Sequence, residues 1–307
     1  MKLLITGSKG QLGTELAAQL AAGRGPLGPV DPRYAGAQVV GVDLDTVDIT
    51  DSGALQGLVD GGGFDIVFNC ASFTDVNACE TAPELARAVN ARAVGDMARL
   101  CAQTGAKLVH ISTDYVFSGD DRREYVETDE PNPATVYGKT KLEGERLAQR
   151  MCPGCLVVRT AWLYGRCGKN FVKTMLALAE RRGELTVVND QFGNPTNAAD
   201  LSQHLLALAV SGQSGIFHCT NNGITNWCDF AAEIMRLFSK GVKVIPCTTG
   251  EYAKANPGLA PRPNYSPLDN RRLRGMGADR MRDWRQALAA FAREHARDFA
   301  GESEGAV

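Results

Sequence analysis

The first 22 residues constrain the fold more than any other part of the chain. A short apolar run, Lys2–Thr6, is followed by Gly7, Gly10 and Gly13, and residues 14–22 then carry leucines four positions apart, on one helical face. A strand, a glycine turn and a helix in this order form a unit that binds the diphosphate of a dinucleotide, because the glycines let the backbone approach it and the helix N-terminus supplies amide donors. The residues that this unit assigns to a cofactor are Gly7, Gly10, Gln11, Leu12 and Gly13.

Apolar runs and helical patterns continue to alternate through the first half of the chain. We expect strands at Lys2–Thr6, Gln38–Val42, 65–70, 107–112 and 155–160, and helices at 52–59, 83–104 and 136–150. Such alternation predicts an α/β fold with a doubly wound parallel sheet and right-handed crossovers. The intervening residues 23–37 are rich in Gly and Pro and predict a long surface loop of unassigned function.

The alternation weakens after residue 164. Helical patterns there cover 170–182, 197–211, 226–239 and 282–297. We therefore expect a nucleotide-binding domain at 1–164 and a smaller C-terminal α/β substrate lobe at 165–307, with the chain crossing back to the first domain near 185–200. The Pro-rich stretch 256–267 predicts a linker or an ordered loop across the cleft, and 301–307 a frayed tail.

Composition excludes several classes of partner. A net charge of −2 over 307 residues, without a concentrated basic run, argues against nucleic acid and anionic membrane surfaces. No apolar run approaches the roughly 20 residues of a membrane span, and the opening run is too short for a signal peptide, so we expect a cytoplasmic protein. The nine cysteines predict reduced thiols, and neither Cys152-Pro-Gly-Cys155 nor the four dispersed histidines predict a metal site.

Three residues have the side chains that reduction of a ketone requires. Thr113 closes a predicted strand, and Tyr137 and Lys141 are four positions apart, on one face of a predicted helix. A phenol with a pKa near ~10 is a poor acid at neutrality, so a neighbouring ammonium is needed to stabilise the phenolate left behind. We expect Tyr137 to protonate the substrate oxygen, Thr113 to hold it, and Tyr137 and Lys141 also to contact the cofactor that supplies the hydride.

The cofactor is predicted to be NADH or NADPH. Asp43 ends the second strand, where a carboxylate bonds the adenosine ribose, so it favours NADH because a 2′-phosphate would meet like charge. Lys9 nevertheless leaves room for NADPH. The remaining cofactor candidates are Asp48 and Ile49 beside the adenine, and Cys70, Ala71, Ser72 and Thr74, which follow the third strand.

Several longer blocks resemble the extended short-chain dehydrogenase/reductase family, in particular its branch that reduces 4-keto sugars linked to dTDP. The resemblance covers nearly the whole chain. Its most specific blocks are His110-Ile-Ser-Thr-Asp-Tyr-Val-Phe117, Val136-Tyr-Gly-Lys-Thr-Lys-Leu-Glu-Gly144, Arg159-Thr-Ala-Trp162-Leu-Tyr and Asn189-Asp-Gln-Phe-Gly-Asn-Pro-Thr196. It implies a Rossmann-type sheet and reduction of the C4 ketone of dTDP-4-dehydro-L-rhamnose to dTDP-L-rhamnose.

The resemblance also implies site residues. Thr113, Asp114 and Trp162 resemble contacts to a dTDP-linked deoxysugar, and Asn170, Gln191 and Arg262 are further substrate candidates, Arg262 because a guanidinium fits a diphosphate. Nucleotide-sugar dehydratases that resemble this chain have a glutamate at the position of Tyr115. Because the glutamate is absent here, the resemblance disfavours dehydration as the reaction. Glu15 matches a glutamate that some relatives use for magnesium, yet one carboxylate makes no magnesium site, so no metal is expected to be required.

Other functions remain open at this point. The chain is also compatible with a reductase or epimerase acting on another nucleotide-linked keto sugar. It resembles, in addition, the non-catalytic regulatory β subunit of methionine adenosyltransferase, although an intact Thr113, Tyr137 and Lys141 set speaks against a pure binding role. Either a monomer or a homodimer is expected. The segment 73–80 departs from the commoner family pattern, which affects one edge of the predicted site.

Overall fold

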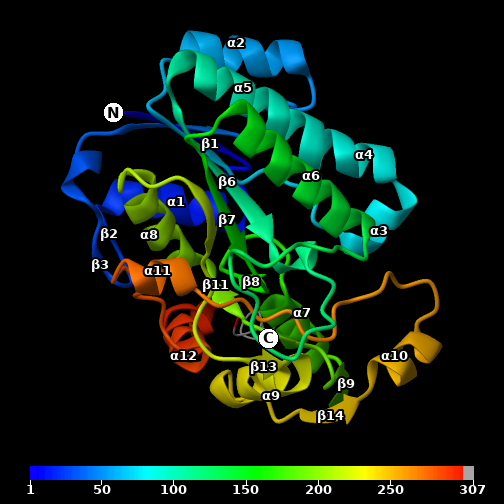
Figure 1. Cartoon of the computed structure of the whole chain (residues 1–307). Helices are drawn as coiled ribbons and strands as arrows, with labels where there is room; N and C mark the ends of the chain where they lie inside the picture. Colours follow the sequence, from blue (N-terminus) through cyan, green and yellow to red (C-terminus); the bar gives the residue numbers. More distant parts are fainter. Residues whose placement is uncertain (300–307) are drawn as a thin grey trace.

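A parallel six-stranded sheet forms the centre of the computed structural model, which describes residues 1–299 (Figure 1). Its strand order is β12-β7-β6-β5-β1-β4, and every neighbouring pair is parallel. The bounds are β1 (Lys2–Thr6), β4 (Gln38–Val42), β5 (Ile66–Asn69), β6 (Lys107–Thr113), β7 (Leu156–Thr160) and β12 (Gly215–His218). The prediction of a doubly wound parallel sheet is confirmed. The tail predicted at 301–307 lies outside the described residues.

Helices cover both faces of this sheet because successive strand residues point in opposite directions. Leu3 and Ile5 pack into one buried cluster with residues of α1 and α8, whereas Leu4 packs into another with residues of α2, α5 and α6. The helices are α1 (Gln11–Ala22) and α8 (Ala198–Ala209) on the first face, and α2 (Ser52–Gly62), α5 (Ala93–Thr104) and α6 (Val136–Met151) on the second.

The helix expected at 83–104 is interrupted. It consists of α4 (Pro83–Arg87), a π-helical turn at Ala88–Arg92 and then α5, with α3 (Val76–Thr81) just before it. Gly144 of α6 lies so close to this turn that a Cβ there would come 2.1 Å from the Asn90 carbonyl oxygen. The widened turn places the Asn90 side chain toward the loop after β5, which a regular helix pattern does not predict.

The chain returns to the large sheet in its second half. Helix α8 packs against α1, and β12 pairs with β7 at the edge of the sheet. Residues 198–218 therefore belong with the first domain rather than with the lobe assigned to 165–307. The crossing begins close to the position expected for it, near 185–200, and it adds a sixth strand that the sequence analysis did not assign.

A smaller lobe lies beyond the carboxyl ends of the large sheet (Figure 1). Its own core combines residues of α7, α9, α12 and the parallel pair β9–β14. The bounds are α7 (Phe171–Ala179), β9 (Glu184–Val188), α9 (Trp227–Leu237), β14 (Lys243–Cys247), α10 (Thr249–Ala255) and α12 (Trp284–His295), followed by a 3-10 turn at Ala296–Asp298. Helix α11 (Arg271–Gly275) packs instead against β12 of the large sheet. Two-residue strands connect the lobes: β8 (Leu163–Tyr164) with β11 (Thr196–Asn197), and β10 (Phe192–Gly193) with β13 (Thr225–Asn226).

The long loop at 23–37 is ordered by contacts with α8. It contains a short hairpin, β2 (Arg24–Gly25) with β3 (Gly28–Pro29), and a 3-10 turn at Pro32–Tyr34. Gln203 accepts from the Leu27 amide at 2.8 Å and donates to the Gly28 carbonyl at 2.9 Å. The loop therefore packs over a helix that sequence analysis had placed in the other lobe. Across residues 1–299, no helix is both long and apolar enough to cross a membrane.

Candidate active site

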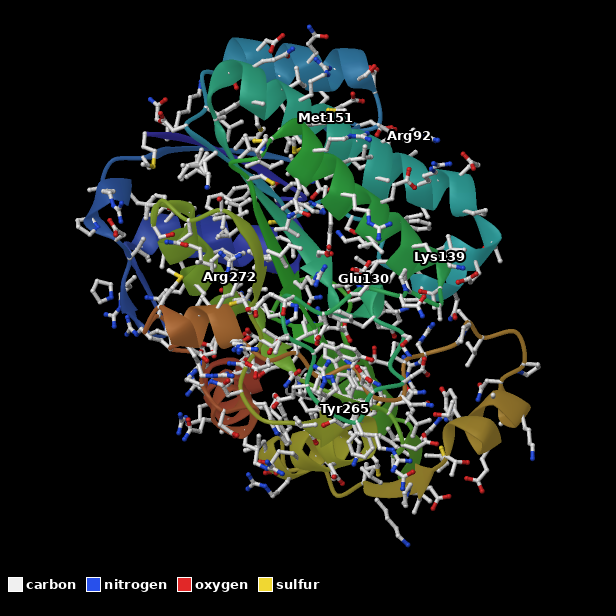
Figure 2. All side chains as sticks on the ribbon, in the orientation of Figure 1. Arg92, Glu130, Lys139, Met151, Tyr265 and Arg272 are labelled. Atoms are coloured by element: carbon white, nitrogen blue, oxygen red, sulfur yellow. The ribbon has the colours of Figure 1, made fainter. Side chains whose placement is uncertain are left out.

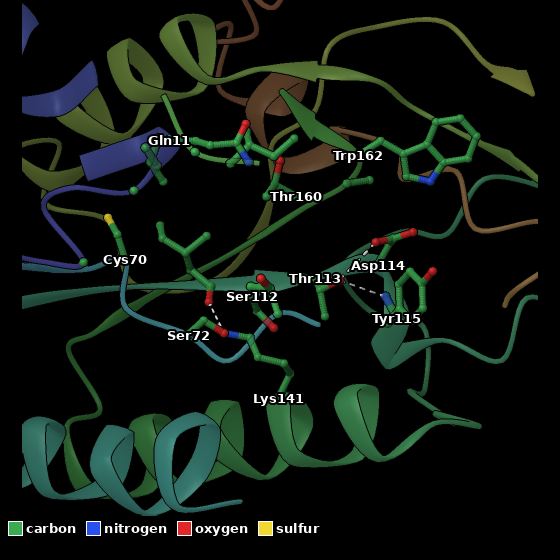
Figure 3. A pocket seen from close by; sticks show the side chains of 18 of the residues that line it. Gln11, Cys70, Ser72, Ser112, Thr113, Asp114, Tyr115, Lys141, Thr160 and Trp162 are labelled. Atoms are coloured by element: carbon green, nitrogen blue, oxygen red, sulfur yellow. Dashed lines mark hydrogen bonds between the residues drawn. The ribbon is translucent and has the colours of Figure 1, made fainter. Parts of the chain in front are cut away.

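One cavity of about 500 Å³ opens at the carboxyl edge of the large sheet. It lies where the strand order reverses between β1 and β5, the place at which open α/β sheets bind ligands, and Gly7 after β1 and Cys70 after β5 both line it. Thr113, Tyr137 and Lys141 line the same cavity. Figure 3 shows Gln11 and Trp162 on one side of this space and Lys141 on the other. The structure thus brings the predicted glycine turn and the predicted reacting residues to one site.

The glycine turn forms a close cradle. Gly7 has a φ of 65°, and a Cβ there would lie 2.8 Å from the Ala71 amide nitrogen. At Gly13, a Cβ would come 2.3 Å from the Gly7 carbonyl oxygen. Both positions require glycine, since the backbones of the turn, of α1 and of the loop after β5 meet here. The N-terminus of α1, which starts at Gln11, follows directly and fits a diphosphate group.

Two buried hydroxyls in the cavity have no hydrogen-bond partner among residues 1–299. They are Ser112 Oγ on β6 and Thr160 Oγ1 on β7, and both residues line the cavity (Figure 3). Buried polar atoms are nearly always paired in native proteins, so these hydroxyls match a polar ligand such as the nicotinamide end of a dinucleotide. Neither residue was assigned a role from the sequence, although Ser112 lies within the quoted block His110–Phe117 and Thr160 within the quoted block that begins at Arg159.

Helix α6 positions Tyr137 and Lys141. Thr135 caps its N-terminus by accepting from the Gly138 amide at 3.0 Å, so Tyr137 stands in the first turn and Lys141 one turn further along the same buried face. Gly138 also permits close approach to the end of β6, because a Cβ there would lie 2.1 Å from the Tyr115 carbonyl oxygen. The phenol of Tyr137 consequently lies beside Thr113, with the Tyr115 ring edge-on at 5.5 Å.

Burial dominates the ionisation of both groups. It raises the pKa of Tyr137 well above its usual value, against a smaller lowering by a side-chain hydrogen bond with Thr113. Burial lowers the pKa of Lys141 to about 8, while Glu145 and Cys70 act in the opposite direction. The Lys141 ammonium donates to the Ile111 carbonyl oxygen at 2.6 Å. At neutral pH the phenol therefore holds its proton and the ammonium remains charged.

The neighbouring Lys139 shows the contrast with Lys141. Figure 2 labels Lys139 on the same helix, where its side chain is exposed, whereas Lys141 is only 2% exposed. Burying an ammonium is unfavourable unless it is paired or hydrogen-bonded, so the position of Lys141 indicates a functional constraint rather than a solvated surface charge.

Asp114 joins the two lobes at the site. It is fully buried, and its carboxylate accepts from the Thr113 hydroxyl at 3.0 Å and from the Ser266 hydroxyl at 2.6 Å. Burial raises the pKa of Asp114 to about 6, although these hydrogen bonds lower it. Thr113 is held in turn by the Tyr115 amide, which donates to its hydroxyl at 3.2 Å at the 3-10 turn Asp114–Val116. The predicted substrate contact Asp114 is thus adjacent to the reacting hydroxyl.

Asn90 fixes the loop after β5 on the cofactor side. Its side-chain oxygen accepts from the Ser72 hydroxyl at 2.8 Å and from the Phe73 amide at 2.9 Å, while its amide group donates to the Phe73 carbonyl at 3.0 Å. Ser72 and Thr74 line the cavity, as does Cys70. The sequence analysis gave Asn90 no role, whereas in the structure its side chain supports this loop.

The adenosine end of the predicted cofactor site is more open. Asp43 accepts from the Lys9 and Leu44 amides at 2.9 Å each, beside the glycine turn. Asp48 accepts from the amide and hydroxyl of Thr50, which holds a surface turn. Asp43, Asp48, Ile49 and Ala71 do not line the 500 Å³ cavity. Asp43 nevertheless lies at the end of β4, next to the turn, as predicted.

A second cavity of about 390 Å³ lies in the smaller lobe. Gln191 and Arg262 line it, together with aromatic and aliphatic side chains including Trp227. Arg262 donates to Asn77 Oδ1 of α3 at 3.1 Å and to the Ala260 carbonyl at 3.3 Å. Within residues 1–299, no carboxylate forms a salt bridge with its guanidinium. The cavity therefore offers an uncompensated cation among apolar walls.

The structure does not bring Asn170 into either cavity. Its side-chain oxygen caps α7 by accepting from the Lys173 amide, and its amide group donates to Gln11 at 3.1 Å and to the Gly165 carbonyl at 2.8 Å. Both polar atoms of the Asn170 side chain are thus engaged between α7, the Gly165 backbone and α1, which gives it a structural role; its contact to the substrate stays a prediction.

The described residues offer no ready metal centre. Over the range 1–299, no group of three or more His, Cys, Asp or Glu side chains is arranged to hold a metal ion. Burial raises the pKa of Glu15, and nearby Glu294 adds to this rise. That no metal is required stays a prediction.

A doubly wound sheet with a glycine turn facing a Thr, Tyr and Lys set defines an NAD(P)-dependent oxidoreductase of the short-chain dehydrogenase/reductase class. Comparison with known families is more specific. The family described as RmlD substrate binding domain matches residues 1–297, and the chain belongs to it.

Relatives with known names cover most of the chain. A dTDP-4-dehydrorhamnose reductase of Mycobacterium tuberculosis is 39% identical over 94% of this chain and 91% of its own length. A dTDP-4-keto-6-deoxy-D-glucose reductase of Streptomyces niveus is 36% identical, over 93% and 94%. Among solved structures, a dTDP-4-dehydrorhamnose reductase of Clostridium acetobutylicum has a TM-score of 0.88 at 41% identity, covering 96% of this chain and 99% of that one. One from Bacillus anthracis in complex with NADP has a TM-score of 0.86 at 35% identity, covering 95% and 99%.

Proposed function

We propose that the protein reduces the C4 ketone of dTDP-4-dehydro-L-rhamnose to dTDP-L-rhamnose, with NADH or NADPH as the hydride donor. The observation that carries this proposal is the single cavity in which the glycine turn faces Thr113, Tyr137 and Lys141. Reduction of a carbonyl group needs a hydride donor and a proton donor at the same place. In this cavity a cofactor bound at the glycine turn would lie beside the Tyr137 phenol. The named reductases among the relatives support the choice of substrate.

The chain's own residues hold the reacting groups. Gly7 and Gly13 provide the close backbone approach for the cofactor diphosphate, and Ser112 and Thr160 offer unpaired hydroxyls to its reactive end or to the substrate. The cofactor, when bound, supplies the hydride. The Thr113 hydroxyl orients the ketone oxygen, and Tyr137, which burial keeps protonated at neutral pH, gives its proton to that oxygen.

Lys141 completes this proton transfer. Its ammonium charge stabilises the phenolate that Tyr137 becomes, since an opposite charge in a buried site favours the ionised form. The cation is charged at neutral pH because its pKa, although lowered by burial, is about 8. In the structure the Thr113 hydroxyl donates to Asp114, so it turns from that carboxylate to donate to the ketone oxygen when the substrate binds. Asp114, which also accepts from Ser266, then offers a carboxylate oxygen to the sugar hydroxyls.

A nucleotide-linked sugar would span both cavities. The sugar fits beside Trp162 in the larger cavity, and the nucleotide fits the second one. There the Arg262 guanidinium, which pairs with no carboxylate among residues 1–299, suits a diphosphate, and Gln191 offers hydrogen bonds. Gln191 donates to the Thr249 hydroxyl at 3.0 Å, which fixes its side chain at the cavity wall.

We further propose a preference for NADH. The Asp43 carboxylate lies against the glycine turn, where a 2′-phosphate would meet its charge, and the nearest cation, Lys9, is already paired with Asp45. NADPH remains usable if that exposed pair opens. The B. anthracis relative was solved with NADP, so both cofactors belong in the test. A cytoplasmic location and a monomeric or homodimeric state complete the proposal.

The test is a coupled assay from dTDP-glucose with the upstream enzymes, run with NADH and NADPH in parallel. We expect consumption of the reduced cofactor that depends on the keto sugar, with formation of dTDP-L-rhamnose, and a loss of at least about 100-fold in Tyr137→Phe, which keeps the ring but has no proton to give. Absence of turnover by the wild-type protein with both cofactors would refute the proposal.

A second candidate is reduction of another dTDP-linked 4-keto sugar. It is favoured by the S. niveus relative, whose name gives dTDP-4-keto-6-deoxy-D-glucose as its substrate. The same assay without the epimerase that precedes rhamnose formation distinguishes the two. Turnover that is faster without that epimerase would assign the second substrate.

A further inference from the structure

Trp227 stands between the two cavities. It is the residue that lines both the 500 Å³ cavity with Tyr137 and the 390 Å³ cavity with Arg262. It begins α9, directly after β13, and Asn226 caps that helix by accepting from the Asp229 amide at 2.8 Å. Its ring is half-buried, so part of it faces the cavities.

The ring of Trp227 is stacked on that of Trp162. The two indoles are 3.5 Å apart between centroids, with an angle of 5° between their planes. Phe171 contacts Trp227 in addition, with centroids 4.4 Å apart and planes at 46°. This arrangement connects Trp162, at the wall of the reaction cavity, to the aromatic core of the smaller lobe.

Trp162 needs such support because its backbone is unfavourable. Its φ is 46°, and among residues 1–299 only Ser239 shares a positive φ without being glycine. A bulky residue rarely adopts this conformation unless the surrounding structure imposes it. Gly193 leaves space for the ring, since a Cβ there would lie 2.5 Å from the Trp162 indole. The stack with Trp227 and the gap at Gly193 together determine where the Trp162 ring lies.

We propose that Trp227 is a positioning residue for the sugar half of the substrate, acting through Trp162. This inference rests on the proposed function, because a nucleotide sugar must place its sugar in one cavity and its nucleotide in the other. Trp227 holds the Trp162 ring against the sugar at the point where the two cavities meet. Loss of the stack frees the Trp162 ring to leave this position, so binding of the sugar weakens more than binding of the nucleotide, for which Trp227 is only one part of the cavity wall.

The test is a double-mutant cycle with Trp162→Leu, Trp227→Leu and the double variant, using calorimetry with dTDP-L-rhamnose and with dTDP alone. We expect each single variant to bind dTDP-L-rhamnose roughly tenfold more weakly, as loss of an aromatic contact does, and the double variant to be no worse than either. Affinity for dTDP and for NADH should change by less than about threefold in Trp227→Leu. Trp227→Phe, which retains a stacking ring, should restore most of the affinity for the sugar nucleotide.

Phe230→Leu is the matched control. Phe230 is fully buried in the same aromatic core, with its ring centroid 6.4 Å from that of Trp227. This variant should lower the melting temperature without changing the ratio of dTDP-L-rhamnose affinity to dTDP affinity. A second readout is the exciton-split circular dichroism of the stacked indoles, which should persist in Trp284→Phe and disappear in Trp227→Phe.

Two kinds of failure are distinguishable. A wild-type protein that neither binds dTDP-L-rhamnose nor turns over its keto precursor would overturn the proposed function, and this inference with it. A wild-type protein that does both, combined with unchanged sugar-nucleotide affinity in Trp227→Leu or with additive losses in the cycle, would overturn the role of Trp227 alone.

Discussion

At the scale of single residues, the site depends on charges and protons that burial has shifted. Lys141 is the clearest case, because a buried ammonium with a pKa of about 8 loses its charge within the range of an ordinary activity assay. Its position opposite the glycine turn was predictable from the four-residue spacing to Tyr137, whereas its lowered pKa was not, since desolvation depends on residues distant in the sequence. Two residues beside Lys141 come from distant parts of the chain: Cys70 follows β5, and Ile111 belongs to β6.

The first prediction concerns the pH dependence of Lys141. Since kcat/KM for the reduced cofactor reports groups of the free enzyme, it should fall about tenfold per pH unit above pH ~8 as the ammonium loses its proton. In Lys141→Arg, which stays charged, the fall should move to higher pH even if the overall rate is lower. Lys139→Met, the exposed neighbour on the same helix, should keep the wild-type profile. A fall at the same pH in Lys141→Arg would assign it to another group.

A second prediction concerns Asp114 and the stability of the fold. Its folded-state pKa of about 6 lies above the ordinary 3.8, so the folded protein takes up the proton more readily than the unfolded chain. Its contribution to stability is therefore fully present below pH ~3.8 and is lost as pH rises through 6, with a total of the order of 3 kcal/mol. Asp114→Asn should raise the free energy of unfolding by about 1–3 kcal/mol at pH 8 and by little at pH 4.

Thermal or urea unfolding at the two pH values measures this difference. Asp114→Asn should also be less active than wild type, because it removes the carboxylate beside Thr113. A variant that is more stable but less active would indicate that the site keeps an unfavourable charge for its function. Asp120→Asn, at an exposed acid nearby, should change the stability little at either pH. Equal stability of Asp114→Asn and wild type at pH 8 would show that the ionised carboxylate is fully compensated by its hydrogen bonds.

At the scale of elements, local pattern predicted the long strands and helices and missed the irregular ones. The apolar runs at β1, β4, β5, β6 and β7 were found to within two residues at either end, because buried parallel strands are nearly continuous in apolar residues. The helix at 83–104 was expected to be regular. Its π turn could not be predicted, since it depends on the closeness of α6 at Gly144 and on the hydrogen bonds of Asn90 to the loop after β5.

That closeness gives a third prediction. In Gly144→Ala the new Cβ would meet the Asn90 carbonyl oxygen, a backbone atom, at 2.1 Å, so the π turn or α6 must shift. We expect destabilisation by about 1–3 kcal/mol and a raised KM for NADH, because the displaced Asn90 no longer holds Ser72 at the cavity. Gly57→Ala in α2 is the control: nothing lies within 4 Å of its Cβ position, and the better helix propensity should stabilise it by up to about 1 kcal/mol.

At the scale of the whole molecule, the arrangement of the lobes was the least predictable part. Residues 198–218 return to the large sheet as α8 and β12. This return could not be predicted, because the sequence of a helix followed by a four-residue strand does not indicate which sheet the strand joins. The second cavity likewise combines residues from 171 to 262 with Asn77 of the first domain. Gln191 was predicted from a family block and Arg262 from the fit of a guanidinium to a diphosphate. Trp227 and Asn77 were not predicted, because no local spacing connects them with the site.

The last prediction follows from the contact that closes the second cavity. The Pro-rich segment expected as a linker or a loop across the cleft is fastened to the first domain by Asn77 Oδ1, which accepts from the Ala260 amide at 3.0 Å and from Arg262 at 3.1 Å. In Asn77→Ala both donors lose their partner, so the segment separates from α3 and the KM for the nucleotide sugar should rise about tenfold, with the KM for NADH unchanged. Asn77→Asp keeps an acceptor for both donors but pairs Arg262 with a carboxylate, so its KM for the nucleotide sugar should also rise, through the lost cation rather than through a lost anchor. Equal KM values in all three proteins would mean that Arg262 reaches the diphosphate without this anchor, and that the two lobes are held together by their cores alone.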